Sequence, residues 1–72
     1  MPFPQSMFQE VRRRRKQAGM SQTDLALHAG VGRRFVSELE GGKTSVQLDK
    51  VLAVLAVFGL SLDLVRPLNG AG

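Results

Sequence analysis

The sequence predicts a small all-α domain with four helices and one C-terminal β-strand. Three observations carry this prediction. The 72 residues suffice for a single domain with a thin core. Apolar residues recur at helical spacing in four segments, and a glycine follows each segment. Only residues 61–65, which follow Leu60, have the alternating pattern of a strand, and Pro67 stops the predicted strand.

The first predicted helix follows a segment with two prolines, residues 1–5, which we expect to be disordered. Ser6 is a suitable N-cap, and Gly19 ends the helix. The apolar positions of this helix are Met7, Phe8, Val11 and Ala18. They skip a basic run, so either Arg14 or Arg15 must lie over the core, where a buried guanidinium needs a partner.

Residues 21–42 predict two short helices joined by a tight turn. Ser21 can cap the first of them, whose apolar face consists of Leu25, Ala26 and Ala29. Gly30 falls where this helix should end, because glycine enters the left-handed conformation without steric cost. Gly32 is a permissive N-cap for the next helix.

The helix after Gly32 has two contrasting faces. Val36, Leu39 and part of Phe35 form its apolar side, whereas its outer side carries Arg33, Arg34, Ser37 and Glu38. A short helix, a glycine turn and a helix with a basic outer face indicate a helix-turn-helix that binds DNA. The alternative is an ordinary helical hairpin in a small bundle.

Charge favours the DNA-binding interpretation. Ten Lys and Arg residues against six Asp and Glu residues give a net charge of +4, which suits a polyanionic partner. Half of the basic residues lie in one run, residues 12–16.

The fourth predicted helix begins at Ser45 or Gln47 and ends at Gly59. Its expected core stripe consists of Leu48, Val51, Leu52, Leu55, Ala56 and Phe58. The apolar run is broad enough to suggest burial on more than one side, as in a helix that also meets a partner subunit.

Other chemistries find little support. The chain has no cysteine, and its one histidine, His28, has only Asp24 at helical spacing as a potential partner, so we expect neither a metal or other cofactor nor an enzymatic activity. No apolar stretch reaches the length needed to span a membrane. We expect the chain in the bacterial cytoplasm, associated with the nucleoid.

Several motifs resemble a known family. Ser21-Gln22, Leu25-Ala26, Gly30-Val31 and the run from Ser37 to Glu40 before Gly42-Lys43 resemble the XRE/Cro-type, lambda-repressor-like helix-turn-helix domain of phage repressors. Residues 30–43 together with 48–65 resemble, more narrowly, the HipB-like antitoxins of toxin–antitoxin operons. The resemblance covers about residues 8–67.

The resemblance and the basic residues together give candidate contacts with DNA. Gln22 matches a family glutamine that meets a phosphate, and the further phosphate candidates are Gly32, Lys43, Thr44, Arg12, Arg13 and Lys16. The candidates for base contacts are Arg33, Arg34, Ser37 and Glu38, although Glu38 is better placed to restrain Arg34 through an i,i+4 pair. The family pattern also implies a structural ion pair between Arg15 and Glu40.

The C-terminal strand has no mate in its own chain, so its simplest partner is the same segment of a second subunit. The expected dimer interface consists of Val54, Phe58, Leu60, Leu62 and Leu64. The predicted organisation is a DNA-binding domain over residues 6–60, a dimerising strand over 61–67 and a disordered tail over 68–72.

The sequence therefore predicts a homodimeric, sequence-specific repressor that binds double-stranded DNA. The HipB-like resemblance implies an antitoxin that autoregulates its operon and neutralises a HipA-like kinase toxin. The alternatives are a stand-alone phage-type repressor and a helix-turn-helix module that binds another protein.

Overall fold

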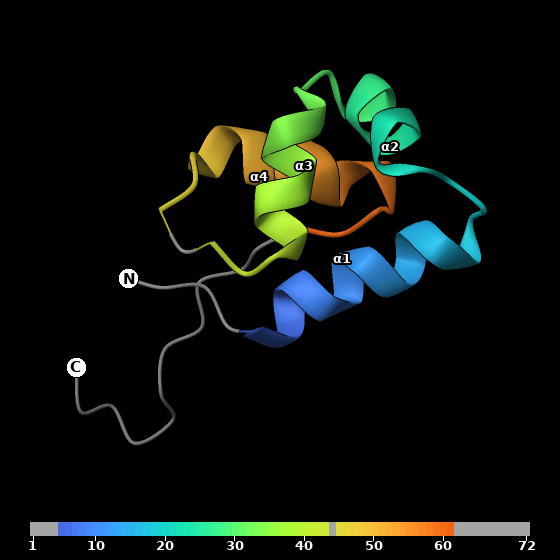
Figure 1. The fold of residues 1–72 in the computed structure, drawn as a ribbon, viewed down its shortest axis with the longest axis horizontal. Coiled ribbons are helices and arrows are strands. Elements are labelled where there is room, and N and C mark those ends of the chain that lie inside the picture. Colours follow the sequence, from blue (N-terminus) through green and yellow to red (C-terminus); the bar gives the residue numbers. More distant parts are fainter. Residues whose placement is uncertain (1–4, 44, 62–72) are drawn as a thin grey trace.

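The computed structural model describes residues 5–43 and 45–61, which form four helices (Figure 1). They are α1 (Gln5–Gln17), α2 (Gln22–Ala29), α3 (Arg33–Glu40) and α4 (Leu48–Val57). α2 packs on both α3 and α4, and α1 packs across α3. The four-helix prediction is confirmed, with α1 starting one residue before the expected cap at Ser6 and α4 starting after Gln47. The described residues contain no strand, and residues 62–67 of the expected strand lie outside them.

One core joins the helices. Its buried side chains come from all four and are Phe8, Val11, Leu25, Ala26, Val36, Leu39, Val51, Val54 and Leu55. Met20, Val31 and Phe35 pack against this cluster while staying partly exposed. The helical spacing of apolar residues thus identified the inward faces of α2 and α3, where Leu25, Val36 and Leu39 have no exposed surface.

The helices share one type of C-terminus. Gly19, Gly30, Gly42 and Gly59 follow the helices in sequence order, and all have positive φ. After α2, for example, Gly30 has φ 73°, and the N–H of Val31 donates back to the carbonyl of Ala26 at 3.0 Å. This arrangement satisfies carbonyl groups that the helix leaves free and turns the chain sharply toward α3.

Parts of the predicted core are wrong. Leu48 and Leu52 are 53% and 39% exposed, and Ala56 and Ala18 are also exposed. Val54, expected at a dimer interface, is instead fully buried within its own chain and has no surface left for a partner. The reason is that α4 is apolar on nearly every side, so periodicity could not identify which face α2 and α3 cover.

Candidate nucleic-acid interface

The outer face of α3 presents the expected polar residues. Arg33, Arg34 and Ser37 are exposed, and the Arg34 side chain is 92% exposed. Val36 and Leu39 on the opposite side are fully buried and hold the helix on the core. Two exposed guanidinium groups at the N-terminal half of a helix are well placed to reach base edges in a major groove.

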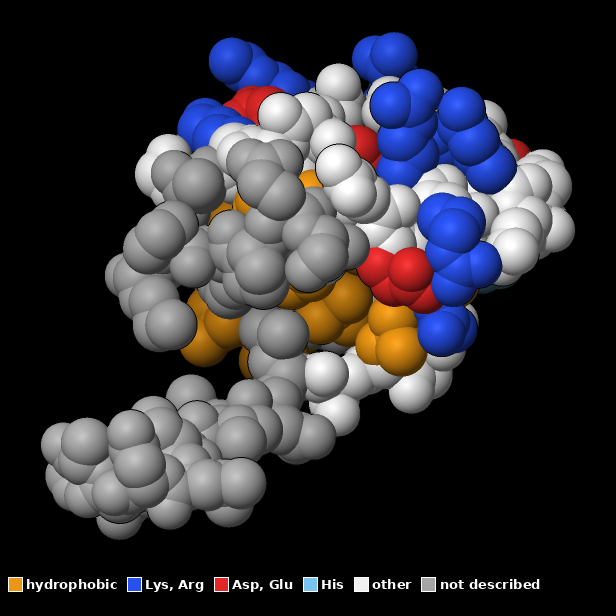
Figure 2. Space-filling view, turned by 90° about the horizontal axis from the view of Figure 1, so that it is seen from below, with side chains coloured by type: hydrophobic (Ala, Val, Ile, Leu, Met, Phe, Trp, Pro, Cys, Tyr) orange, Lys and Arg blue, Asp and Glu red, His pale blue; other side chains and the backbone are white. Residues whose placement is uncertain are grey.

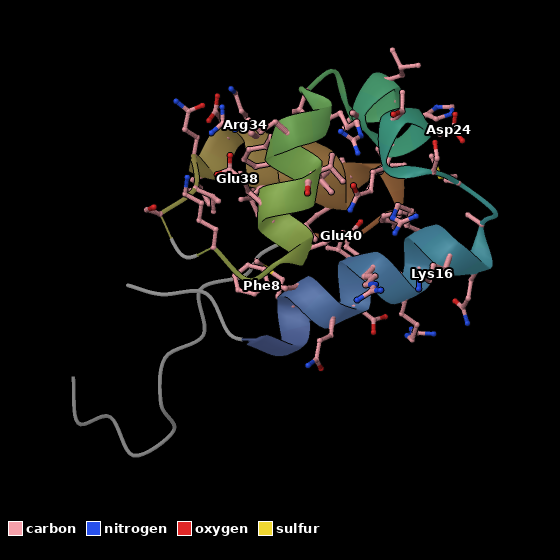
Figure 3. All side chains as sticks on the ribbon, in the orientation of Figure 1. Phe8, Lys16, Asp24, Arg34, Glu38 and Glu40 are labelled. Carbon is pink, nitrogen blue, oxygen red and sulfur yellow. The ribbon has the colours of Figure 1, made fainter. Side chains whose placement is uncertain are left out.

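Glu38 lies on the same face and has two basic partners. Its Oε1 accepts a hydrogen bond from Arg34 Nε at 3.1 Å, and Figure 3 labels both of these residues. Its Oε2 accepts from Lys43 Nζ. Lys43 first, and Arg34 in addition, hold the pKa of this carboxyl below its usual range. The i,i+4 pair that the sequence favoured for Glu38 is present, whereas its contact with a base remains a prediction.

The start of α2 is built around a capping box. The N–H of Asp24 donates to Ser21 Oγ at 3.0 Å, and the N–H of Ser21 donates to Asp24 Oδ2 at 2.9 Å. This second bond is the main cause of the lowered pKa of the Asp24 carboxyl. Gln22, the first residue of α2, lies next to this cap, at the end of the helix where backbone N–H groups favour an anion.

Gln22 borders an open pocket of about 250 Å³ between α1, α2 and α3. The pocket is lined by polar side chains and one glycine: Arg12, Arg15, Gln22, Ser37, Glu40 and Gly41. Of the predicted phosphate contacts, the structure therefore brings Arg12 and Gln22 together, beside the base candidate Ser37. A hollow with a guanidinium, an amide and a hydroxyl suits a phosphate of the DNA backbone.

Two of the lining residues, Arg15 and Glu40, form an ion pair. Arg15 Nε lies 2.7 Å from Glu40 Oε2, and Arg15 Nη2 lies 3.0 Å from Oε1. Arg15 Nη1 also donates to the carbonyl of Met20 at 2.8 Å, and Gln22 Nε2 donates to Glu40 Oε1 at 3.3 Å. The structure thus brings together the predicted pair, and the same carboxylate also holds the amide of Gln22.

The other basic residues of α1 divide into two sets. Arg13 and Arg14 both pair with Glu10, whose pKa falls to about 2, chiefly because Arg13 donates hydrogen bonds to it. Arg12 and Lys16 are exposed. Figure 2 shows Lys and Arg side chains over the upper and right parts of this face, with acidic side chains next to some of them, and hydrophobic side chains in its lower part.

A second open pocket lies on another side of α3, near the start of α4. It is lined by Gly32, Arg34, Phe35, Glu38, Ser45, Val46, Gln47 and Lys50. Lys50, whose Nζ lies 5.9 Å from the centroid of the Phe35 ring, is a cation that the sequence analysis missed. The signal in the sequence that could have identified Lys50 as an exposed residue is its place beside Asp49 in the first turn of α4. The α3 N-cap, Gly32, makes no side-chain cap.

The remaining predicted residues lie apart from this face or outside the described residues. Phe58 and Leu60 are half-buried at the end of α4. Thr44, Leu62 and Leu64 fall outside the part of the chain that the structure describes. Within that part, His, Cys, Asp and Glu residues form no group of three or more that would hold a metal ion. No described helix has the length and apolar character that crossing a membrane requires.

Comparisons with known proteins agree with this architecture. A family model described as helix-turn-helix matches residues 11–65. An uncharacterized HTH-type transcriptional regulator, y4mF of Sinorhizobium fredii, is 47% identical over 53 residues, covering 74% of this chain and 70% of that protein. An uncharacterized HTH-type transcriptional regulator of Haemophilus influenzae is 33% identical over 60 residues, covering 83% of this chain and 61% of that protein. The matched residues include the whole turn between α2 and α3.

Proposed function

The chain belongs to the helix-turn-helix family, and we propose that it is a transcription regulator that recognises a specific sequence of double-stranded DNA and represses its promoter. One observation carries this proposal. Arg33, Arg34 and Ser37 are exposed on α3, while Val36 and Leu39 fix the opposite face of that helix in the core. The names of the two relatives, both HTH-type transcriptional regulators, support the same function.

Residues of three helices have different roles in recognition. α3 enters the major groove, where Arg33 and Arg34 donate to guanine O6 and N7. Gln22 and Arg12, at the pocket beside α3, contact the phosphates that fix the position of the helix in the groove. Phosphate contacts supply affinity for any duplex, and the arginines supply the preference for one sequence.

Selection of bound duplexes from a random library, followed by fluorescence anisotropy, tests this function. One duplex should bind far more tightly than random DNA, and its affinity should fall by orders of magnitude between roughly 50 and 200 mM salt, because several phosphates are neutralised. The absence of any preferred sequence would refute specific recognition. A flat salt response would refute the phosphate contacts.

We propose further that the regulator acts as a homodimer. Leu48 and Leu52 leave apolar surface exposed on α4, and Phe58 and Leu60, which follow this helix, are half-buried against the core. Residues 61–67, with Leu62 and Leu64 on one face, would then pair with the same segment of a second subunit and cover this surface. A two-fold axis there would set the two recognition helices about 34 Å apart, one turn of DNA.

Truncation after Leu60 tests the dimer. The expected result in sedimentation is a weaker dimer, and thermal unfolding should show a lower melting temperature that depends on concentration. A truncated chain that remains dimeric and binds DNA like the full chain would refute the role of the strand.

The HipB-like sequence resemblance supports a narrower proposal, namely that the chain is the antitoxin of a HipBA-like operon in the bacterial cytoplasm. It would then bind a HipA-like kinase toxin and autoregulate the operon promoter, without catalytic activity of its own. Co-purification of the chain with the product of its neighbouring gene, with and without the promoter fragment, tests this role. A chain that represses its promoter without a toxin partner would be a stand-alone phage-type repressor, and one that binds protein but no DNA would be an interaction module.

A further inference from the structure

Glu38 is an acidic residue on a surface that otherwise suits DNA. It lies on the outer face of α3, and its side chain is 30% exposed. A carboxylate at this position repels the phosphates of a bound duplex, so a protein that needed only affinity would gain from its absence. Its two partners suggest what it contributes instead.

The two oxygens of Glu38 serve different cations. Oε1 accepts from Arg34 Nε at 3.1 Å, and Oε2 accepts from the Nζ of Lys43, in the loop that follows α3. The Arg34 contact uses only Nε, so the two terminal nitrogens of the guanidinium, the pair that binds guanine, can still donate. The Lys43 contact instead uses one of the three N–H donors of the ammonium and places a negative charge directly beside the positive charge that a phosphate would attract.

We propose that Glu38 determines sequence specificity by acting on both cations in opposite ways, an inference that rests on the proposed DNA-binding function. It positions Arg34 for a bidentate contact with one base, and it keeps the charge of Lys43 from binding phosphates of any sequence. Glu38 thereby strengthens the preferred duplex relative to random DNA, although it lowers the total attraction to DNA.

Glu10 provides a matched control. It is also a glutamate with two basic partners, Arg13 and Arg14, and it lies on α1 rather than on α3. Substituting glutamine at either position removes one negative charge and breaks the ion pairs of two basic side chains. Only the substitution at Glu38 removes a contact from an arginine of the recognition helix, so the pair of variants separates positioning from charge.

The experiment measures the affinity of the full-length chain, Glu38→Gln and Glu10→Gln for two probes, the selected duplex and a random duplex, at several salt concentrations. Glu38→Gln should bind random DNA roughly five- to tenfold more tightly at 0.1 M salt, with a log–log salt slope steeper by about 0.9, because one further cation meets a phosphate. Its preference for the selected duplex should fall at least about fivefold, the lower end of what one arginine–guanine contact contributes. Glu10→Gln should leave the preference unchanged.

The outcomes separate this inference from the function on which it rests. If the unsubstituted chain shows no preferred duplex, the proposed function itself fails. If it has a preference that Glu38→Gln retains in full, or that Glu10→Gln loses equally, the role of Glu38 is refuted while specific binding stands. Both ion pairs lie at the surface, so each substitution should lower the melting temperature by only a few degrees, and both variants should remain folded under the conditions of the binding assay.

Discussion

Replacing Arg15 by alanine should destabilise the fold severely. The guanidinium makes two hydrogen bonds to Glu40, at 2.7 and 3.0 Å, and one to the carbonyl of Met20. The side chains of Arg15 and Glu40 are only 11% and 4% exposed, so Arg15→Ala leaves a carboxylate with little access to water. Removing one partner of a buried ion pair costs about 3–5 kcal/mol.

That loss is large for so small a domain. At about 0.05–0.15 kcal/mol per residue, a chain of this length has a total stability of roughly 4–11 kcal/mol. Each kcal/mol lowers the melting temperature of such a domain by about 4–8 °C, so Arg15→Ala should melt at least about 12 °C below the parent. Thermal unfolding followed by circular dichroism measures this difference.

Two companion variants decide whether the reasoning is right. Arg13 pairs with Glu10 at the surface, so Arg13→Ala should cost only about 0–1 kcal/mol. Adding Glu40→Gln to Arg15→Ala removes the unpaired charge and should recover part of the lost stability, although Glu40→Gln alone destabilises. Equal melting temperatures for Arg15→Ala and Arg13→Ala would refute a buried pair that ties α1 to α3.

Three further outcomes follow from the interface and the helix ends. Arg33→Ala and Arg34→Ala should each reduce the discrimination between bases at defined positions of the duplex by about 1–3 kcal/mol. If both variants discriminate between bases as the unsubstituted chain does, the recognition face is wrongly assigned. Glu10 has a pKa of about 2 in the fold against about 4.3 when unfolded, so its stabilisation is present above pH 4.3 and is lost as the pH falls toward 2. Melting temperatures that stay constant over that range would contradict this. Gly30→Ala places a residue with a Cβ at φ 73°, where that Cβ would contact no other atom. The substitution should therefore lower the free energy of unfolding by about 1–2 kcal/mol through backbone strain alone. Gly30→Asn should lower the melting temperature less in the same assay.

Local signals in the sequence were enough to predict much of the fold. Ser21 identified the start of α2, although the reciprocal bond to Asp24 was not predicted, and the glycines after the helices identified their ends, because capping depends only on residues close in the chain. The two faces of α3 were also predictable, since charged and apolar residues separate clearly at a period of 3.6.

The sequence did not predict features that depend on how one helix packs against another. Val54 and Leu52 are both apolar residues of α4, yet one is fully buried and the other is 39% exposed. Only the position of α2 and α3 over one side of α4 distinguishes them. For the same reason Lys50 was overlooked, because its place beside Phe35 and the second pocket depends on how α3 packs near the start of α4.

Two glutamates on α3 illustrate how one helix joins stability to recognition. Glu40 faces α1, and its Oε1 accepts from Arg15 Nη2 at 3.0 Å and from Gln22 Nε2 at 3.3 Å. Glu38, two residues earlier, faces outward and holds Arg34 and Lys43. A residue spacing of two places side chains about 200° apart around a helix, so the same residue type serves the core on one side and DNA on the other. Since Glu40 also holds Gln22, a loss of the buried pair should misplace a phosphate contact in molecules that are still folded.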